Sequence, residues 1–469
     1  MVCETAVILA AGAGTRMKSD LPKVLHRICG KPILAYVIEE VKAAGIQEIV
    51  LVVGHGAQEV EAEISRRYQK DPNIKFVLQQ EQLGTGHAVM QAKDLIQDTG
   101  NVIVLCGDTP LISTQSIQAF AQAHKEQGNA ATVLTASLDR PFGYGRIIRN
   151  QQGQVQSIVE EKDASADQKL IREVNSGMYC FRGSLLRQNL DRLSTNNSQK
   201  EYYLTDVLTI AVADGEQAGA YCIDDPIEIL GINTRVQQAE AEAAMRRRIN
   251  EAHMLAGVTM IDPAQTYIEP GVTIGTDTQL WPGVILSGHT VIGTGCTIGQ
   301  NSRLVNAIVG DQVEIQSSVI TDSSIGSHTT VGPYAYLRPG SRIGSHVKIG
   351  DFVEVKNAVI GDHSKASHLA YVGDADVGQH VNIGCGVVFV NYDGRNKART
   401  TVRDGAFIGS NSNLVAPVTV EEDAYVAAGT TVARDVPGGA LCIGREKEKH
   451  IEGWVARKGL SRKPEGGSK

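Results

Sequence analysis

The chain has 469 residues, of which 42% are hydrophobic and 21% charged, with a formal net charge of −7. This length is too great for one ordinary hydrophobic core and predicts a globular protein of at least two domains. The negative charge argues against nucleic acid as a partner. The eight scattered cysteines include no CxxC pair, which argues against a zinc cluster or a disulfide framework.

The first residues show no targeting signal. Glu4 stands where a secretory signal would carry basic residues, and the apolar run that follows is short. No window approaches the roughly 18 consecutive apolar residues that a membrane span requires. Together with the scattered cysteines, these features predict a cytoplasmic protein that has no membrane partner.

Up to about Ile232 the sequence alternates between continuous apolar strands and amphipathic helices. A buried strand is predicted for "TAVILAA", and Pro32 opens a helix that Gly45 ends. Further strands are predicted at 48–53, 74–78, 101–106 and 130–136. This alternation predicts a Rossmann-like α/β domain, residues 1–235, whose mostly parallel sheet binds ligands beyond the carboxyl ends of its strands.

The next segment, Thr234 to Ala256, is rich in alanine, glutamate and arginine and predicts a helix. We expect residues 236–256 to form a helical linker between domains, and its run of charges to be a solvated face.

Beyond this helix the aliphatic residues recur every six positions. The first run comprises Ile268, Ile274, Leu280, Leu286, Ile292, Ile298 and Leu304; the register slips near Val309 and resumes at Ile325. A period of six fits no α-helix and is typical of a parallel β-helix, which we predict for residues 257–469. The proteins that this pattern resembles, the hexapeptide-repeat proteins, coil left-handed. The tail 461–469, "SRKPEGGSK", is expected to be disordered.

A regular prism has flat faces and no deep pocket, so a β-helix that binds large substrates is predicted to assemble. Three-fold closure would leave clefts between neighbouring prisms, and we therefore expect a homotrimer. His368, Asn391 and the loop 389–402 would then meet Arg445 and the region of Trp454 in adjacent chains.

The stretch "LAAGAGTRMKSDLPK" follows the first strand and fits neither a Walker loop nor a dinucleotide fingerprint. Its functional interpretation uses Gly12 and Gly14 to bring backbone N–H groups to phosphate oxygens, with Arg16 and Lys23 supplying positive charge. The alternative is an ordinary strand-to-helix turn with a surface arginine. Asp108, at the end of the strand 101–106, is a candidate Mg²⁺ ligand, although a lone aspartate there is as often a cap.

Other motifs carry polar groups suited to a nucleotide, a sugar or a phosphate. The loop "QQEQLGTGHA" could recognise a base, and Gly145, Glu160 and Asn175 lie in motifs suited to sugar hydroxyls. In the β-helix, His368 and Tyr371 stand where the hexapeptide period breaks, just before the polar loop 389–402. A histidine in a repeat is more often structural, but nearby basic residues favour a binding site.

The order of "LAAGAGTRM", "QLGTGHA", "GYGRI", "NSGMY" and "GINTR" before the hexapeptides resembles the bacterial bifunctional UDP-N-acetylglucosamine pyrophosphorylases and glucosamine-1-phosphate N-acetyltransferases. The resemblance implies uridylyl transfer in the first domain and acetyl transfer in the last. It implies Mg²⁺ as cofactor, UTP and acetyl-CoA as co-substrates, and glucosamine 1-phosphate and N-acetylglucosamine 1-phosphate as sugar substrates. The last domain would act first, and the product would serve cell-wall synthesis.

The resemblance also implies roles for individual residues of the first domain. The uracil nucleotide would be held by Leu9, Ala10, Ala11, Gly12, Gln79, Gly84 and Thr85; the sugar by Gly145, Glu160 and Asn175; the triphosphate by the catalytic Arg16 and Lys23; and Mg²⁺ by Asp108 and Asn233. One departure is Cys106, where relatives often carry tyrosine or alanine.

In the last domain the resemblance makes His368 the general base. Arg338 and Lys356 would hold the sugar's phosphate; Tyr371, Asn382 and Asn391 would orient its ring; and Tyr392, Ser410, Ala428 and Arg445 would contact coenzyme A. A second departure is Cys385, close to the expected acyl donor and usually alanine in that family.

Two alternatives remain. One is another sugar-1-phosphate nucleotidyltransferase whose hexapeptide domain serves only for oligomerisation. The other is a regulatory scaffold without chemistry, against which the presence of Arg16, Lys23, Asp108 and Asn233 weighs, because a scaffold has no physical need for them.

Overall fold

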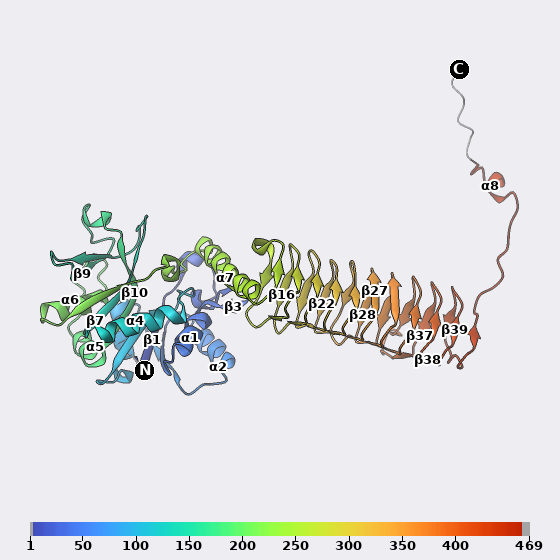
Figure 1. The fold of residues 1–469 in the computed structure, drawn as a ribbon, viewed down its shortest axis with the longest axis horizontal. Coiled ribbons are helices and arrows are strands. Elements are labelled where there is room, and N and C mark those ends of the chain that lie inside the picture. The colour runs from blue at the N-terminus through green and yellow to red at the C-terminus, as the bar shows by residue number, and fades with distance from the viewer. Residues whose placement is uncertain (1–2, 462–469) are drawn as a thin grey trace, which may run out of the picture. The chain divides into compact units, whose positions relative to one another are not determined.

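The computed structural model describes residues 3–461, and its chain divides into two compact units (Figure 1). The first comprises Met1–Ala252 with Tyr267–Pro270, and the second comprises His253–Thr266 with Gly271–Lys469. No helix in the described part of the chain is long and apolar enough to cross a membrane. The tail predicted to be disordered lies, except for Ser461, outside the described residues.

The first unit is built on a mixed sheet with the strand order β11-β7-β10-β6-β1-β4-β5. Its strands are β1 Thr5–Ala10, β4 Glu48–Val53, β5 Ile74–Leu78, β6 Asn101–Cys106, β7 Ala131–Ser137, β10 Glu173–Arg182 and β11 Ala218–Cys222. The predicted strands are confirmed, and neighbouring strands in this order are parallel with one exception. The exception is β10, which pairs antiparallel with both β6 and β7. A hairpin, β8 Arg146–Arg149 and β9 Val155–Val159, joins β10 at its edge.

Helices cover both faces of this sheet, as continuous apolar strands require. One face packs on α1 Ile33–Ala43, α2 Ala57–Arg67 and α4 Thr114–Glu126, and the other on α3 Thr85–Gln91, α5 Gly183–Leu190 and α6 Thr205–Ala213. Residues of β1 alternate between the two cores: Ala6 and Ile8 join the first, and Val7 joins the second. The carboxyl ends of β1 and β6, which are neighbours, therefore sit on a rigid base.

The predicted helix after the sheet is α7, Arg235–Leu255. Ala241, Ala244 and Met245 are buried against the first unit. The expectation that its charges form only a solvated face is wrong: the Arg246 guanidinium lies 4.9 Å from the Tyr267 ring centroid, and Arg248 donates to the carbonyl of Leu111. Both arginines pack their long stems on the protein, which charge patterning alone does not indicate.

A parallel β-helix accounts for the second unit and includes β13, which the division into units assigns to the first. Among the described residues it has three sheets of eleven, ten and nine strands, and Figure 1 shows its coils following one another along the axis of the helix. The sheets run from β12 Thr259–Met260 to β41 Leu441–Cys442, from β13 Tyr267–Ile268 to β40 Thr431–Val432, and from β14 Thr273–Ile274 to β38 Val418–Val420. The predicted site residues lie on β28 Glu354–Lys356, β30 Lys365–His368, β31 Tyr371–Gly373 and β33 Asn382–Ile383, or directly follow β25 Tyr336–Leu337 and β34 Val388–Val390; the neighbouring strand β27 is Lys348–Asp351.

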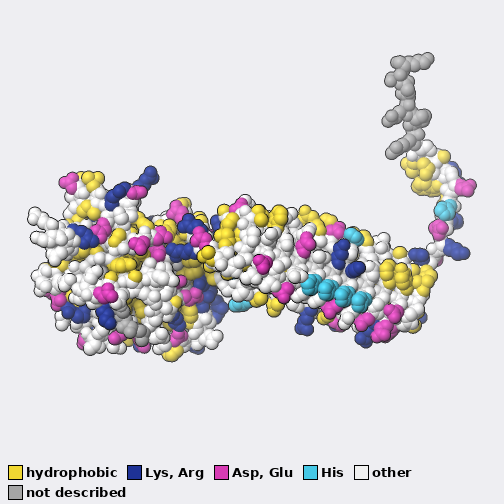
Figure 2. All heavy atoms as spheres, viewed as in Figure 1, with side chains coloured by type: hydrophobic (Ala, Val, Ile, Leu, Met, Phe, Trp, Pro, Cys, Tyr) yellow, Lys and Arg dark blue, Asp and Glu magenta, His cyan; other side chains and the backbone are white. Residues whose placement is uncertain are grey.

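The six-residue period places one aliphatic side chain per strand inside the prism. Leu304, Ile320, Leu337 and Val355 are all fully buried on successive strands of one sheet. The chain turns between sheets through residues with positive φ. At one of these corners, histidine occupies the same position in four consecutive coils. His328, His346, His363 and His380 stack with ring centroids 4.8 Å apart, forming the row of histidines visible in Figure 2. Burial of the aliphatic side chains and the backbone conformation at the corners therefore explain the six-residue repeat, and no functional role is needed to account for it.

Candidate active sites

A pocket of about 340 Å³ opens at the carboxyl ends of β1 and β6, where the sequence predicts the nucleotide site. Nine predicted residues line it: Leu9, Ala10, Ala11, Gly12, Lys23, Gln79, Gly84, Thr85 and Asp108. Cys106, noted in the sequence as a departure from the family pattern, also lines it, as do four residues that were not singled out: Val24, Gln82, Ala88 and Glu201. Segments far apart in the chain therefore converge on one cavity.

The loop after β1 owes its shape to Gly14 and Pro22. Gly14 has φ 61°, and a Cβ there would lie 2.7 Å from Cβ of Lys23. Pro22 precedes the short 3₁₀ helix η2, Lys23–Leu25, and directs Lys23 back over the loop. Arg16 belongs to η1, Thr15–Met17, and is exposed; the described lining of the pocket does not extend to it.

Lys23 is the centre of the charged part of the pocket. Its ammonium group forms an ion pair with Asp108 and donates to Oδ1 of Asn233 over 3.1 Å. Lys23 and Asp108 have side chains only 12% and 19% exposed. The carboxylate oxygen of Asp108 and the amide oxygen of Asn233 are thus directed at one cation. Asp108 and Asn233 therefore fit the oxygen donor set that Mg²⁺ prefers.

Two glutamines shape the wall opposite this charge. Gln79 is buried, and its Nε2 donates to the carbonyl of Gly84 and lies 3.1 Å from Nδ1 of His87. Gln82 Nε2 donates to the carbonyl of Ala11 over 2.9 Å, so it joins this wall to the loop after β1. The motif that contains Gln82 was recognised in the sequence, but the motif alone does not show which amide reaches that loop.

The predicted sugar residues lie together beside the pocket rather than in its lining. A Cβ on Gly145 would lie 3.3 Å from Oε1 of Glu160 and 3.4 Å from Cβ of Asn175. Asn175 N–H donates to the carbonyl of Gly145, and Oδ1 of Asn175 accepts from the Tyr179 hydroxyl over 3.0 Å. Burial, and then the charges of neighbouring acidic groups, raise the pKa of Glu160.

Cys106 is a thiol of low reactivity. Burial, followed by the nearby carboxylate of Asp108, raises its pKa to about 12, and its Sγ donates to the carbonyl of Gly177 over 3.5 Å. Since the thiolate is the nucleophilic form, Cys106 remains protonated and serves as a wall of the pocket.

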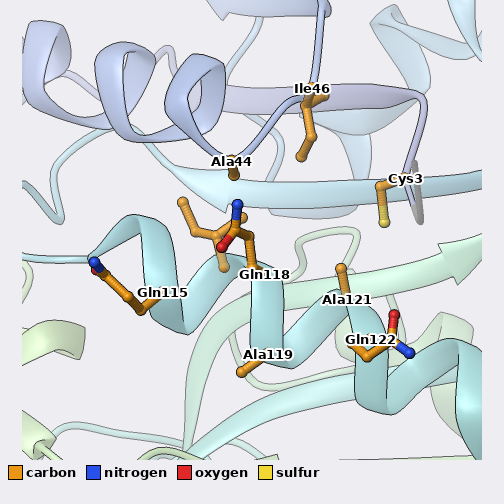
Figure 3. A pocket seen from close by; sticks show the side chains of 9 residues that line it. Cys3, Ala44, Ile46, Gln115, Gln118, Ala119, Ala121 and Gln122 are labelled. Atoms are coloured by element: carbon orange, nitrogen blue, oxygen red, sulfur yellow. The ribbon is translucent and has the colours of Figure 1, made fainter.

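A second hollow of about 520 Å³ in the same unit differs in chemistry (Figure 3). Apolar groups such as Ile46 and Ala121 line it, and Gln115, Gln118 and Gln122 supply its polar groups. Cys3 also lines it, with Sγ 3.3 Å from Sγ of Cys180. No charged residue appears among its described lining residues, and it is therefore unsuited to a triphosphate.

In the β-helix, His368 pairs with a carboxylate that the sequence analysis missed. His368 Nδ1 lies 2.7 Å from Oδ1 of Asp351, which is the register partner of His368 on the preceding coil. The hydrogen bond from His368 holds the pKa of Asp351 below its usual range. The signal that could have found Asp351 is the spacing of 17 residues, which is one coil.

Asp374 is the second missed residue, and it brings three predicted residues together. Its carboxylate accepts from Lys356 over 3.0 Å and from Nδ2 of Asn391, which also lies 3.4 Å from the Tyr371 hydroxyl. Burial acts to raise the pKa of Asp374, but hydrogen bonds from Asn357, Lys356 and Asn391 lower it overall. Asp374 is thus an ionised, buried anchor for this cluster.

The remaining predicted residues lie on or after strands of two of the three sheets. Arg338, which follows β25, pairs over 2.8 Å with Glu354 on the adjacent strand β28. Cys385, Ser410 and Ala428 follow one another at the edge after His368: Asn411 N–H donates to Cys385, Gly429 N–H to Ser410, and Arg445 to Ala428. Asn382 is half-buried on β33, and Tyr392 is exposed, with its hydroxyl donating to Gly394.

The family models match both units. Residues 5–226 match "Nucleotidyl transferase", and residues 271–306 and 322–357 match "Bacterial transferase hexapeptide (six repeats)". The fold and the two residue clusters thus define a nucleotidyltransferase joined to a left-handed hexapeptide-repeat β-helix.

Full-length relatives narrow this class. Proteins named "Bifunctional protein GlmU" are 56% identical in Alkaliphilus metalliredigens and 58% in Alkaliphilus oremlandii, each over 98% of this chain and 99% of the relative. The same protein of Clostridioides difficile is 54% identical over 97% of each chain. The chain belongs to the GlmU family of bifunctional proteins. A solved structure of UDP-glucose pyrophosphorylase complexed with UDP-glucose also matches, with a TM-score of 0.44 at 19% identity, covering 52% of this chain and 99% of that one.

Proposed function

We propose that this chain catalyses two consecutive reactions in its two units. The second unit transfers the acetyl group of acetyl-CoA to glucosamine 1-phosphate. The first then transfers UMP from UTP to N-acetylglucosamine 1-phosphate, giving UDP-N-acetylglucosamine and pyrophosphate. The observation that carries the proposal is that one GlmU-family chain holds both a pocket lined by the nucleotide motif residues and, in its β-helix, the pairs His368–Asp351 and Lys356–Asp374.

In the first unit, nucleotidyl transfer depends on position and charge. The phosphate oxygen of the sugar phosphate is already a nucleophile, so the protein must align it with the α-phosphate and stabilise the developing charge. Lys23 would leave Asp108 to contact the triphosphate, and Arg16 would approach from the exposed loop. The cluster around Gly145 would hold the sugar. Mg²⁺, held by Asp108 and Asn233, would supply charge neutralisation to the departing pyrophosphate.

In the second unit, His368 is the proposed general base. Donation of Nδ1–H to Asp351 leaves the lone pair on Nε2, which can accept a proton from the amino group as that nitrogen attacks the thioester carbonyl. The thiolate of coenzyme A then leaves. Lys356 and Arg338 would bind the sugar's phosphate, and Asn391 with Tyr371 and Asn382 would orient its ring. Coenzyme A would lie along the edge of Cys385, Ser410 and Ala428, reaching Tyr392 and Arg445.

We also propose the domain limits 1–235, 236–256 and 257–469, a homotrimer, and a cytoplasmic location. The location is where UTP and acetyl-CoA are available, and all eight cysteines are free thiols.

Two single variants of the full chain test the division of labour. Asp108→Ala should abolish pyrophosphate release from UTP and leave acetyl transfer intact, and His368→Ala should do the reverse. CoA release and pyrophosphate release would be measured on the same folded samples. Loss of both activities from either variant would refute independent sites. Absence of acetyl transfer from the unaltered protein would favour a hexapeptide domain that serves only for assembly.

A further inference from the structure

Arg146 is a buried cation beside the sugar cluster. Its side chain is 2% exposed, although arginine is almost never fully buried unless it is paired. Its Nη2 forms an ion pair with Glu161 over 2.7 Å and donates to the carbonyl of Lys169 over 3.4 Å. Its Nη1 donates to the carbonyl of Tyr144. One guanidinium therefore joins three separate segments.

Two of these segments carry proposed sugar contacts. Tyr144 and Arg146 flank Gly145, while Glu161 follows Glu160 directly. In the sheet, Arg146 pairs with Val159 and with Val174, which precede Glu160 and Asn175. The Arg146 side chain thus ties the segment of Gly145 to that of Glu160, while the backbone pairing of its strand places Asn175 beside them.

A contribution to the free energy of unfolding does not by itself explain why a buried ion pair, rather than an apolar pair, occupies these positions. Burying two charges costs solvation energy, and apolar pairs of similar volume often replace such bridges without loss of stability. Among the described residues, Arg146 Nε has no hydrogen-bond partner, so the pair is incompletely satisfied. The planar guanidinium of Arg146 donates hydrogen bonds in two directions and can therefore fix the positions of two segments, which an apolar pair cannot do.

We propose that Arg146, with Glu161, is a positioning residue that holds the sugar-phosphate subsite of the nucleotidyltransferase in its binding geometry. The inference rests on the proposed function, since it assumes that Gly145, Glu160 and Asn175 bind the sugar. The nucleotide wall, formed by Gln79 and Gln82, is anchored by other bonds and is independent of Arg146.

The test uses the full chain with the variants Arg146→Lys, Glu161→Gln and the apolar double variant R146M/E161L. The expected result is a KM for N-acetylglucosamine 1-phosphate raised by about tenfold or more, because displacement of binding groups by about 1 Å weakens productive binding. The KM for UTP should change by less than about twofold. The double variant should unfold at or above the wild-type temperature, which separates positioning from stability. Arg149→Met is the matched control: Arg149 lies on the same strand, pairs with Glu173 over 2.7 Å and donates to the carbonyl of Gly153, so its hydrogen bonds go to residues other than Tyr144 and Glu161.

Calorimetric titration of N-acetylglucosamine 1-phosphate into each variant gives a readout without turnover and should show the same weakening. A folded double variant with wild-type sugar affinity would overturn the inference, as would equal rises in both KM values. Absence of uridylyl transfer in the unaltered chain would instead refute the proposed function.

Discussion

At the scale of the residue, Gly12 and Gly14 are glycine for different physical reasons. Gly14 has φ 61° and contacts Lys23, so the fold itself requires it. A Cβ on Gly12 would meet no atom within 4 Å, so the fold does not require glycine there. The remaining reason for glycine at position 12 is the close approach of a phosphate to the backbone.

Gly12→Ala should therefore retain the wild-type unfolding temperature, while the KM for UTP rises by roughly tenfold as the methyl group blocks the approach of phosphate. Gly14→Ala, the comparison, should lose about 1 kcal/mol of stability because its left-handed backbone disfavours a side chain. Thermal unfolding and UTP titration measure both effects. Equal destabilisation by the two changes would contradict the distinction.

Asp351 offers a second residue-scale prediction. Since the hydrogen bond from His368 lowers the pKa of Asp351, its carboxylate stays charged at any pH well above its ordinary value of about 4. Asp351→Asn should slow acetyl transfer by roughly tenfold or more because the charge that stabilises the protonated base is lost. Its ratio to wild type should be constant between about pH 8 and 9.5, where an imidazole is neutral and the Asp351 carboxylate is charged, and uridylyl transfer should not change. A ratio that varies strongly across this range would contradict an ionised Asp351.

At the scale of the element, the corners of the β-helix select residues by backbone conformation. The stacked histidines have φ between 55° and 62°, a region that asparagine and histidine tolerate and that β-branched residues avoid. His363→Val should cost about 1–2 kcal/mol of stability, and His363→Asn should cost much less. Denaturant unfolding, followed by a probe in the second unit, measures the difference. Similar losses for both would indicate that stacking, rather than the corner conformation, is what matters.

Elements also show what the sequence could predict. Apolar runs such as 48–53 identified the parallel strands, and the six-residue period identified the prism, because both patterns reflect burial. The antiparallel β10 was not predicted: it begins with polar residues and bulges between Asn175 and Tyr179 to form the sugar cluster. Asp374 and Asp351 were missed because their partners lie one coil away, so only stacking makes them neighbours.

At the scale of the whole molecule, each unit has its own core, and α7 completes the first through Ala241 and Met245. The order of the motifs was enough to predict two transfer reactions on one chain, because the residues of each motif are close in sequence and lie near one strand end or edge. A fragment meant to isolate uridylyl transfer should extend to Ala252, because a stop at Arg235 would expose the surface that α7 covers.

The chain after Cys442 carries apolar side chains that its own fold leaves exposed. Ile451, Trp454 and Leu460 are 55%, 45% and 63% exposed, and Trp454 begins the short helix α8, Trp454–Arg457. Exposed apolar groups of this kind are expected to pack on a partner, and the predicted trimer provides neighbouring prisms. Packing there would also complete a cleft at the edge of His368, so acetyl transfer, unlike uridylyl transfer, should depend on assembly.

Trp454→Asp in the full chain should consequently weaken the trimer and reduce acetyl transfer in proportion to the trimer remaining, with pyrophosphate release from UTP unchanged. Sedimentation velocity and both assays, run on the same samples over a dilution series, measure this dependence. Lys458→Asp, also in the exposed chain after Cys442, is the control for added negative charge, because it replaces a polar side chain rather than an apolar one. A monomeric protein with full acetyl transfer would rule out a shared site, because each prism would then supply every group that the reaction needs.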